Sequence, residues 1–209
     1  MNDFQNKKNA YHHGDLRSTL FQIGQEELEQ KGAKAFSLRE VSKKAGVSHM
    51  AAYRHFKNKD ELLISLAKGG FATLAADLEQ AVTGGSTYPE KLIEAGVAYL
   101  QFALRSRQLF QLMFGSYFSS AVFADELKEV TEKTLQSLFT LVQVGVREKS
   151  FSQTESPQTL AYAAWSLVHG VATLVQSNHL KSKDLDEDGS RRLLQNLAGV
   201  LLKGMLASA

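Results

Sequence analysis

Apolar residues recur at helical spacing along most of the chain, and residues that begin or end helices stand between the apolar stretches. In the first stretch Leu16, Leu20, Ile23 and Leu28 share one face, and Gly32 follows as a helix-stop signal. No stretch keeps the alternating pattern of a strand. We therefore expect an all-α fold of about nine helices, the first over about 14–31. The later helices are expected from Ser37 to Gly46, from Ser48 through Arg54, and over about 58–82, 89–105, 107–115, 119–148, 157–178 and 188–206.

Three N-cap residues mark helix starts in the first third of the chain. Ser37 and Glu40 form an S-x-x-E capping box, in which the serine accepts from a free backbone N–H and the glutamate reaches back. Ser48 and Asn58 are further N-cap residues. Gly46 separates the first two of these helices and can adopt the positive φ that a short reversal requires.

We divide the chain into a head, residues 1–57, and a body, residues 58–209, which the long helix 58–82 connects. That helix contains Gly69 and Gly70, each of which costs about 1 kcal/mol relative to alanine in a helix interior. The pair serves either close packing against a neighbouring helix or a hinge between head and body.

The net charge of +2 is unevenly distributed over the 209 residues. Residues 1–60 hold 11 Lys and Arg against 7 Asp and Glu, whereas residues 61–209 hold 13 against 15. The basic head permits nucleic acid as a partner. Because the N-terminus has no apolar signal segment and no apolar run is long enough to span a bilayer, we expect a cytoplasmic protein with no membrane partner.

Residues that would support catalysis or metal binding do not form a recognisable set. The chain has no cysteine, so disulfides and thiolate metal sites are excluded. The neighbouring histidines His12 and His13 do not have the spacing of two ligands on one helix face. Walker, Rossmann, H-E-x-x-H and G-x-S-x-G motifs are absent. We expect no cofactor, no metal and no enzyme activity.

Residues 37–56 combine two short predicted helices with a tight turn at Ala45-Gly46-Val47. Small apolar residues on both sides of the turn, among them Val41 and Ala51, let the helices pack closely at a steep angle. This is the arrangement of a DNA-binding helix-turn-helix, whose second helix enters the major groove. From these residues alone, a plain helical hairpin stays open as the alternative.

Four short motifs of the segment from His12 to Leu62 carry a family resemblance. They are Phe36-Ser37-Leu38-Arg39-Glu40-Val41, Ala45-Gly46-Val47-Ser48, Ala52-Tyr53-Arg54-His55-Phe56 and Asn58-Lys59-Asp60-Glu61-Leu62-Leu63. In order and spacing they resemble the TetR family of bacterial transcriptional regulators.

Two further segments extend the resemblance beyond the head motifs. Tyr11-His12-His13-Gly14-Asp15-Leu16-Arg17 is similar to one subgroup of the TetR family, with no role that the sequence assigns. Trp165-Ser166-Leu167-Val168-His169-Gly170 resembles the W-x-x-x-H-G motif of the family's WHG-type C-terminal domain.

The resemblance implies a homodimeric, all-α regulator. Three N-terminal helices would bind operator DNA, and the C-terminal helices would form a small-molecule pocket and a dimer interface. In such proteins the effector changes the separation of the two DNA-binding heads.

Eight head residues are expected to contact DNA. Ser48, His49 and Ala52 lie on the leading turn of the recognition helix, where base edges come within reach. By the resemblance, Tyr53, His55 and Lys59 contact the phosphate backbone, and Ser37 and Arg39 can reach the DNA from the preceding helix. The alternatives are helix capping for Ser37, packing for Tyr53, and simple solvation for Arg39 and His49.

A pocket in the body is expected to be lined by aromatic residues and methionine, with His169 or a tyrosine hydroxyl as the polar anchor for a small apolar or aromatic effector. The alternative is that these side chains form the core. The predicted residues are Tyr99, Phe102, Phe110, Met113, Phe114, Tyr117, Phe118, Trp165 and His169.

Apolar stripes on helices 157–178 and 188–206 are suited to a four-helix dimer interface with two helices from each subunit. The alternative is that both stripes serve the core of the monomer. The predicted interface residues are Leu167, Val171, Leu174, Leu194, Leu197 and Leu201.

The sequence therefore predicts a sequence-specific, DNA-binding transcriptional regulator. Its expected mode of action is that of a ligand-responsive repressor that binds a palindromic operator as a dimer. The alternative is an architectural DNA-binding protein without a small-molecule inducer.

Overall fold

The computed structural model describes residues 16–118, 121–180 and 185–205. Over these ranges it contains nine α-helices, one short 3-10 turn and no strand, which confirms the predicted all-α fold. The His12-His13 pair and most of the Tyr11–Arg17 motif lie outside the described residues, and so do the side chains of Phe118 and Leu201.

The helix bounds follow the predicted ranges closely. The helices are α1 (Leu16–Ala35), α2 (Leu38–Lys44), α3 (His49–Tyr53), α4 (Lys59–Ala81), α5 (Tyr88–Arg105), α6 (Arg107–Phe114), α7 (Ala121–Arg147), α8 (Pro157–Gln176) and α9 (Glu187–Met205), with the 3-10 turn η1 (Ser116–Phe118) after α6.

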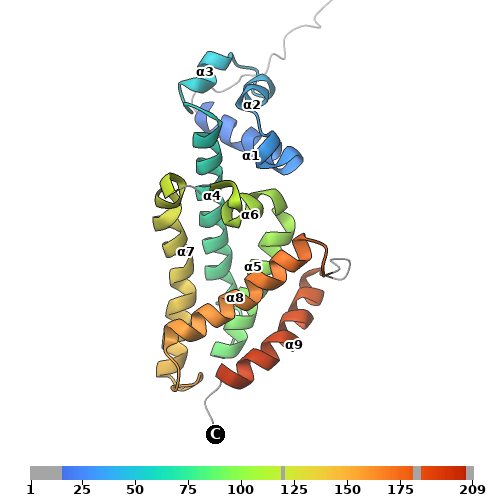
Figure 1. The fold of residues 1–209 in the computed structure, drawn as a ribbon. Helices are drawn as coiled ribbons and strands as arrows, with labels where there is room; N and C mark the ends of the chain where they lie inside the picture. The colour runs from blue at the N-terminus through green and yellow to red at the C-terminus, as the bar shows by residue number, and fades with distance from the viewer. Residues whose placement is uncertain (1–15, 119–120, 181–184, 206–209) are drawn as a thin grey trace, which may run out of the picture.

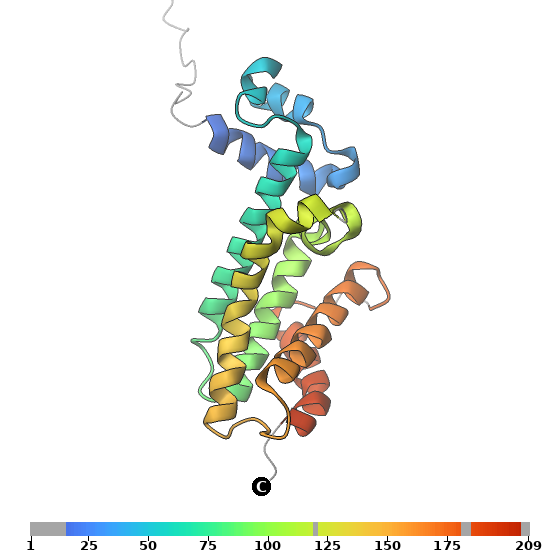
Figure 2. The ribbon, with the colours of Figure 1, turned by 60° about the vertical axis from the view of Figure 1, so that its left-hand side comes forward.

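The head of α1, α2 and α3 lies at one end of the molecule, and α4 runs from it through the length of the body (Figure 1). Helices α5 and α7 pack beside α4, as Figure 2 shows from a second side. Helix α8 crosses this layer obliquely, and α9 packs on α5. Within the described ranges, no helix combines the length and apolar character needed to cross a bilayer.

Local capping begins the head helices where the sequence predicts. Ser37 Oγ accepts from the Glu40 N–H at 3.4 Å, Ser48 Oγ from the Ala51 N–H at 3.2 Å, and Asn58 Oδ1 from the Glu61 N–H at 2.9 Å. All three N-caps are therefore confirmed.

Two glycines change the direction of the chain in the head. Gly46, between α2 and α3, has a φ of +68°, as the reversal requires. Gly32 has a φ of +71° and interrupts α1, which confirms the predicted helix stop. A β-carbon at Gly32 would lie 2.7 Å from Gln108 Oε1, so this glycine also permits a close approach of the body to the head.

A buried carboxylate ties α1 to α2. Glu27 is fully buried and pairs with Lys31 of α1 and Lys44 of α2, each at 2.7 Å. Burial alone would raise the pKa of Glu27, but the hydrogen bonds and charges of the two lysines outweigh it and hold the pKa below its ordinary value. The ion pair between Glu27 and Lys44 thus joins α1 to α2 in addition to the apolar contacts.

One continuous apolar core extends from Leu20 in the head to Leu194 on α9. Phe56, Leu62 and Leu66 belong to it, so the core passes through the point where we divide head from body. The proposed boundary at 57/58 stays a prediction, and the two parts share packing across it.

The glycine pair in α4 lies where neighbouring helices approach most closely. A β-carbon at Gly69 would lie 2.7 Å from the Phe21 ring of α1. One at Gly70 would lie 2.5 Å from Met113 Sδ and 3.1 Å from Leu109 Cγ, both on α6. These distances support the packing explanation of the pair, whereas the hinge stays untested.

We expect Gly70→Ala to lower the free energy of unfolding by about 1–2 kcal/mol, because overpacking against Met113 and Leu109 exceeds the gain of about 1 kcal/mol in helix propensity. Thermal or urea unfolding measures this change. In a Met113→Ala background the same substitution should be less destabilising, because the sulfur is gone and only the looser contact with Leu109 remains. An equal loss in both backgrounds would contradict the packing explanation.

Candidate functional site

Helix α3 presents an exposed polar and aromatic face at the free end of the head. Met50 is 71% exposed and Tyr53 39% exposed, and Ser48 and His49 are exposed beside them. The His49 and Tyr53 rings meet edge to face with centroids 4.5 Å apart. The structure therefore brings together Ser48, His49 and Tyr53 of the predicted DNA-contact set.

Cationic side chains surround this face. Arg39 on α2 and Arg54 and Lys57 after α3 are exposed, and Lys59 at the start of α4 is half-buried, as is His55. A protruding helix with cations beside it has the charge and shape to enter a groove of DNA.

Arg17 on α1 holds the end of α3 in place, a role that the sequence did not reveal. Its Nη1 donates to the His55 carbonyl at 3.0 Å, and its guanidinium lies 4.6 Å from the centroid of the Phe56 ring. The two contacts link residues far apart in the sequence, so no local pattern could have indicated them.

One predicted DNA contact needs correction. Ala52 is fully buried in the core of the head, so its methyl group cannot touch a thymine in this conformation. Its small size instead lets α3 pack against the other head helices. Ser37 caps α2, which is the simpler of its two predicted roles.

Helix α6 of the body begins against α1 of the head. The helix has no side-chain cap of its own at Ser106. The Glu29 carboxylate supplies one, because it accepts from the Gln108 N–H at 3.2 Å and from the Leu109 N–H at 3.0 Å. An acid at this end of a helix also complements its dipole. The contact joins head and body through a charged group.

The far end of α6 reaches the first turn of α4. The Tyr117 hydroxyl donates to Asp60 Oδ1 at 2.8 Å, and Lys59 Nζ lies 5.8 Å from the centroid of the Tyr117 ring. Burial, reinforced by the hydrogen bond and charge of Asp60, raises the pKa of Tyr117 to about 12. We predicted Tyr117 as a ligand contact, but here it connects α6 to the head end of α4.

An apolar cavity lies in the body between α4, α5, α7, α8 and α9. Its empty volume is about 910 Å³, part of which is open to solvent. Phe71, Leu74 and Leu78 form the α4 side, while Leu138 and Leu141 contribute from α7. The apolar lining of this cavity is suited to a small apolar molecule.

The predicted ligand set is only partly on the cavity wall. Tyr99, Phe114 and Trp165 line it. Five of the predicted residues do not line this wall: Phe102, Phe110 and Met113 are buried in the core, whereas Tyr117 and His169 are partly exposed. The sequence missed the aliphatic wall, since its leucines are indistinguishable from core residues by spacing alone.

His169 lies behind the wall in an aromatic cluster. Its Nδ1 is 2.8 Å from the Tyr99 hydroxyl, and its ring stacks on Phe110 with centroids 5.6 Å apart. Burial lowers the pKa of His169 and raises that of Tyr99, so both side chains favour their neutral forms. His169 therefore positions Tyr99 rather than facing the cavity.

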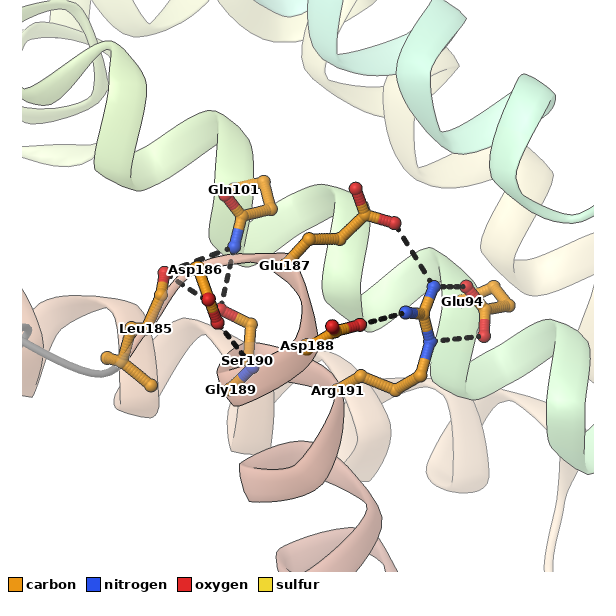
Figure 3. Close-up of polar contacts among 9 residues, drawn as sticks. All are labelled: Glu94, Gln101, Leu185, Asp186, Glu187, Asp188, Gly189, Ser190 and Arg191. Atoms are coloured by element: carbon orange, nitrogen blue, oxygen red, sulfur yellow. Dashed lines mark hydrogen bonds and ion pairs between the residues drawn. The ribbon is translucent and has the colours of Figure 1, made fainter.

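Polar contacts fix α9, which closes one side of the cavity with Leu194 and Ala198. Arg191 donates to both carboxylate oxygens of Glu94 on α5, at 3.0 and 2.8 Å, as Figure 3 shows. Gln101 on α5 donates to Ser190 Oγ at 2.7 Å. These contacts hold the start of α9 at a defined position on α5.

No group of side chains suited to a metal ion occurs among the described residues.

The predicted dimer residues separate into two groups. Val171 and Leu194 are buried in the monomer and Leu167 lines the cavity, so these three serve the core of one chain. Leu174 is 45% exposed and Leu197 is partly exposed. Tyr162 on α8 and Val200 on α9 are also exposed, although we did not predict them. Exposed apolar side chains thus occur on both α8 and α9.

The fold and the exposed α3 face define a helix-turn-helix, DNA-binding regulator. Residues 24–66 match the family model described as "Bacterial regulatory proteins, tetR family", and residues 92–197 match that of the "Tetracyclin repressor-like, C-terminal domain". The chain belongs to the TetR family of bacterial transcriptional regulators. This class of protein acts by binding DNA and is generally not enzymatic.

Relatives and solved structures agree with this assignment. The chain is 25% identical to the HTH-type transcriptional regulator YvkB of Bacillus subtilis strain 168, over 86% of this chain and 92% of that protein. It is 26% identical to the HTH-type transcriptional activator FasR of Mycolicibacterium smegmatis, over 61% and 59%. A structure of a Rhodococcus sp. RHA1 protein of unknown function has a TM-score of 0.82 at 28% identity, over 95% and 99%.

A second solved structure shares the fold at lower identity. The transcriptional regulator FadR of Bacillus subtilis, in complex with stearoyl-CoA, has a TM-score of 0.75 at 19% identity, over 90% of this chain and 98% of that chain. At this identity the likeness concerns the fold alone.

Stability should fall in acid partly because of His169. Burial lowers its folded pKa below the ordinary 6.5, so as the pH falls through 6.5 the unfolded chain takes up the proton first. The contribution of His169 is complete above that pH and declines until the folded ring also protonates. His169→Gln keeps an acceptor for Tyr99, and its free energy of unfolding should fall less between pH 7 and pH 5 than that of wild type. Parallel pH profiles from denaturant titrations would argue against this assignment.

Proposed function

We propose that the protein is a ligand-responsive repressor that binds a palindromic operator as a homodimer in the cytoplasm. The observation that carries the proposal is an apolar cavity whose wall includes a residue of α6, the helix that also contacts the head. An architectural DNA-binding protein needs no such cavity, so the alternative function is less favoured.

The DNA-binding part of the proposal rests on the exposed face of α3. His49 has two ring nitrogens that can donate to or accept from base edges, and Ser48 adds a hydroxyl. The Tyr53 hydroxyl, together with Arg39, His55 and Lys59, would contact the phosphate backbone, which positions the head without specifying sequence.

Effector control rests on the position of α6. Phe114 on α6 lines the cavity, Glu29 of the head caps the start of α6, and Tyr117 beyond it binds Asp60. A ligand that favours one position of Phe114 would thereby favour one arrangement of the head. The complex of FadR with stearoyl-CoA supports ligand binding by a protein of this fold.

The dimer is proposed to form through the outer face of α8 and α9. In the single chain, Tyr162, Leu174 and Val200 are exposed apolar residues on these two helices. Two helices from each subunit would bury them in a four-helix arrangement. A two-fold dimer then places its recognition helices about 34–36 Å apart, or a multiple of this, on a palindromic site.

The DNA contacts can be separated by two conservative variants, measured on a fragment that the protein selects from random DNA. Tyr53→Phe removes a phosphate donor, so affinity should fall by about 1–2 kcal/mol for every sequence alike. His49→Phe keeps the edge-to-face contact with Tyr53 but loses the ring nitrogens, so the preference over scrambled DNA should decrease. Fluorescence anisotropy at one fixed salt concentration measures both. Exchanged phenotypes would show that the two roles are assigned wrongly.

Leu174→Glu should convert the dimer to a monomer and weaken operator binding at least about tenfold, since it places a charge in the proposed interface. The residue is exposed in the single chain, so the monomer should keep its helical content. Sedimentation velocity and anisotropy measure the two effects. Gln136→Glu adds the same charge on the exposed face of α7 and should change neither. A dimeric Leu174→Glu variant with full affinity would refute this interface.

A further inference from the structure

The wall of the body cavity carries no charge. The described residues that line it are aliphatic, aromatic or hydroxyl-bearing, and none is Asp, Glu, Lys, Arg or His. Moving a charged group into such a wall, with no partner of opposite charge, is very costly. The occupant of the cavity should therefore be uncharged where it contacts the wall.

The cavity wall extends along α4. Its wall includes Phe71 and Val82, which are eleven residues apart on or just after this helix. At 1.5 Å per residue this corresponds to about 16 Å. Residues from Thr131 to Leu141 line the opposite side on α7 over a similar length. An alkyl chain of up to this length would contact apolar side chains along the wall.

The hydroxyl groups of the wall already have acceptors. Thr131 Oγ1 donates to the Leu127 carbonyl at 2.8 Å, and Thr134 Oγ1 to the Val130 carbonyl at 2.7 Å. Ser137 Oγ donates to the Thr134 carbonyl, and the Tyr99 hydroxyl is paired with His169. The Thr131, Thr134 and Ser137 hydroxyls therefore offer a ligand no free donor.

The Trp165 indole differs from the hydroxyls. Its Nε1 is buried and makes no hydrogen bond, although the residue lines the cavity. The Tyr99 oxygen is a nearby acceptor: the indole lowers the pKa of Tyr99 as a weak hydrogen-bond donor would, against the larger effect of burial, but the two groups lack the geometry of a full hydrogen bond. A buried donor without an acceptor is rare and unfavourable. A ligand oxygen would satisfy it.

We propose that the cavity binds an uncharged molecule with an extended alkyl body and one oxygen acceptor, such as an ester, whose oxygen accepts a hydrogen bond from Trp165 Nε1. The proposal rests on effector binding as the function of the body, and it adds the chemical class of the effector and its polar anchor. Ala164, beside Trp165 on the wall, offers a position for blocking the cavity.

The test compares three ligands of nearly equal length by displacement of the uncharged dye Nile red from the full chain. Methyl decanoate should bind about fivefold more tightly than undecane, as expected for one neutral hydrogen bond. Decanoate, which is charged at pH 8, should bind at least about a hundredfold more weakly than the ester. Ala164→Phe, which fills the cavity, should abolish displacement by all three.

Two variants separate the indole from the neighbouring hydroxyl. Trp165→Phe should bind the ester more weakly than undecane, because the ester oxygen is then buried without a donor, whereas Tyr99→Phe should keep the fivefold preference for the ester. Melting temperatures show whether each variant folds. A preference that survives in Trp165→Phe, or is lost in Tyr99→Phe alone, would overturn the anchor.

The wild-type chain provides a readout that does not depend on any variant. Trp165 is its single tryptophan, so a proton–nitrogen correlation spectrum contains one indole N–H signal. Methyl decanoate should shift this signal downfield, and undecane should leave it nearly unchanged. Equal shifts, or tightest binding of the decanoate anion, would refute the proposal.

An operator-binding measurement with methyl decanoate keeps this proposal separate from the proposed function. If the ester binds as described but leaves DNA affinity unchanged, effector control by this ligand class fails while the assigned chemistry of the cavity stands. If DNA binding is normal but no uncharged ligand enters the cavity, the assignment of the cavity fails while the regulator function stands.

Discussion

The position of α6 is the constraint on which the rest of the structure depends. Its first turn takes its acceptor from Glu29 of the head, because Ser106 supplies none. Its side chains Leu109 and Met113 lie against the bare backbone of Gly70 on α4. Glu29 therefore fixes α6 against α1 of the head, and Gly70 lets α6 pack closely against α4, the helix that connects head and body. A movement of α6 has to change its contacts with both.

This constraint gives the shared core a functional meaning. Apolar packing is continuous from the head to α9, so a movement of the head relative to the body has to change packing contacts that the two parts share. Two polar contacts hold the ends of this segment: Glu29 accepts at the start of α6, and Tyr117, just after α6, donates to Asp60. A small displacement of α6 would keep or break each of these hydrogen bonds. Coupling between two sites requires such an element with more than one arrangement, which each site can bias.

The sequence was informative wherever the physical cause is local. Ser48 and Asn58 act on N–H groups three residues away, and Gly46 acts through its own φ, so the helix starts and the turn could be predicted. Glu29 and Leu109 are 80 residues apart, and no periodicity indicates that they meet. The apolar pattern of α6 indicated that its side chains are buried, but not which neighbouring helix or cavity each of them faces. Met113 therefore packs on Gly70, and only Phe114 of its predicted aromatic set reaches the cavity wall.

The body contains two features that lower its own stability, and neither supports the head. Side chains around a cavity that nothing fills would lack partner atoms on one side, and a buried donor such as Trp165 Nε1 costs about 1–3 kcal/mol when it has no acceptor. The contacts that hold α6, the ion pairs of Arg191 on α9 and the N-caps of the head helices involve neither the cavity nor the Trp165 indole. A protein that only shaped DNA would gain stability if larger side chains closed the cavity and an apolar ring replaced the indole. The presence of both features in one wall is therefore better explained by a bound molecule that satisfies them together.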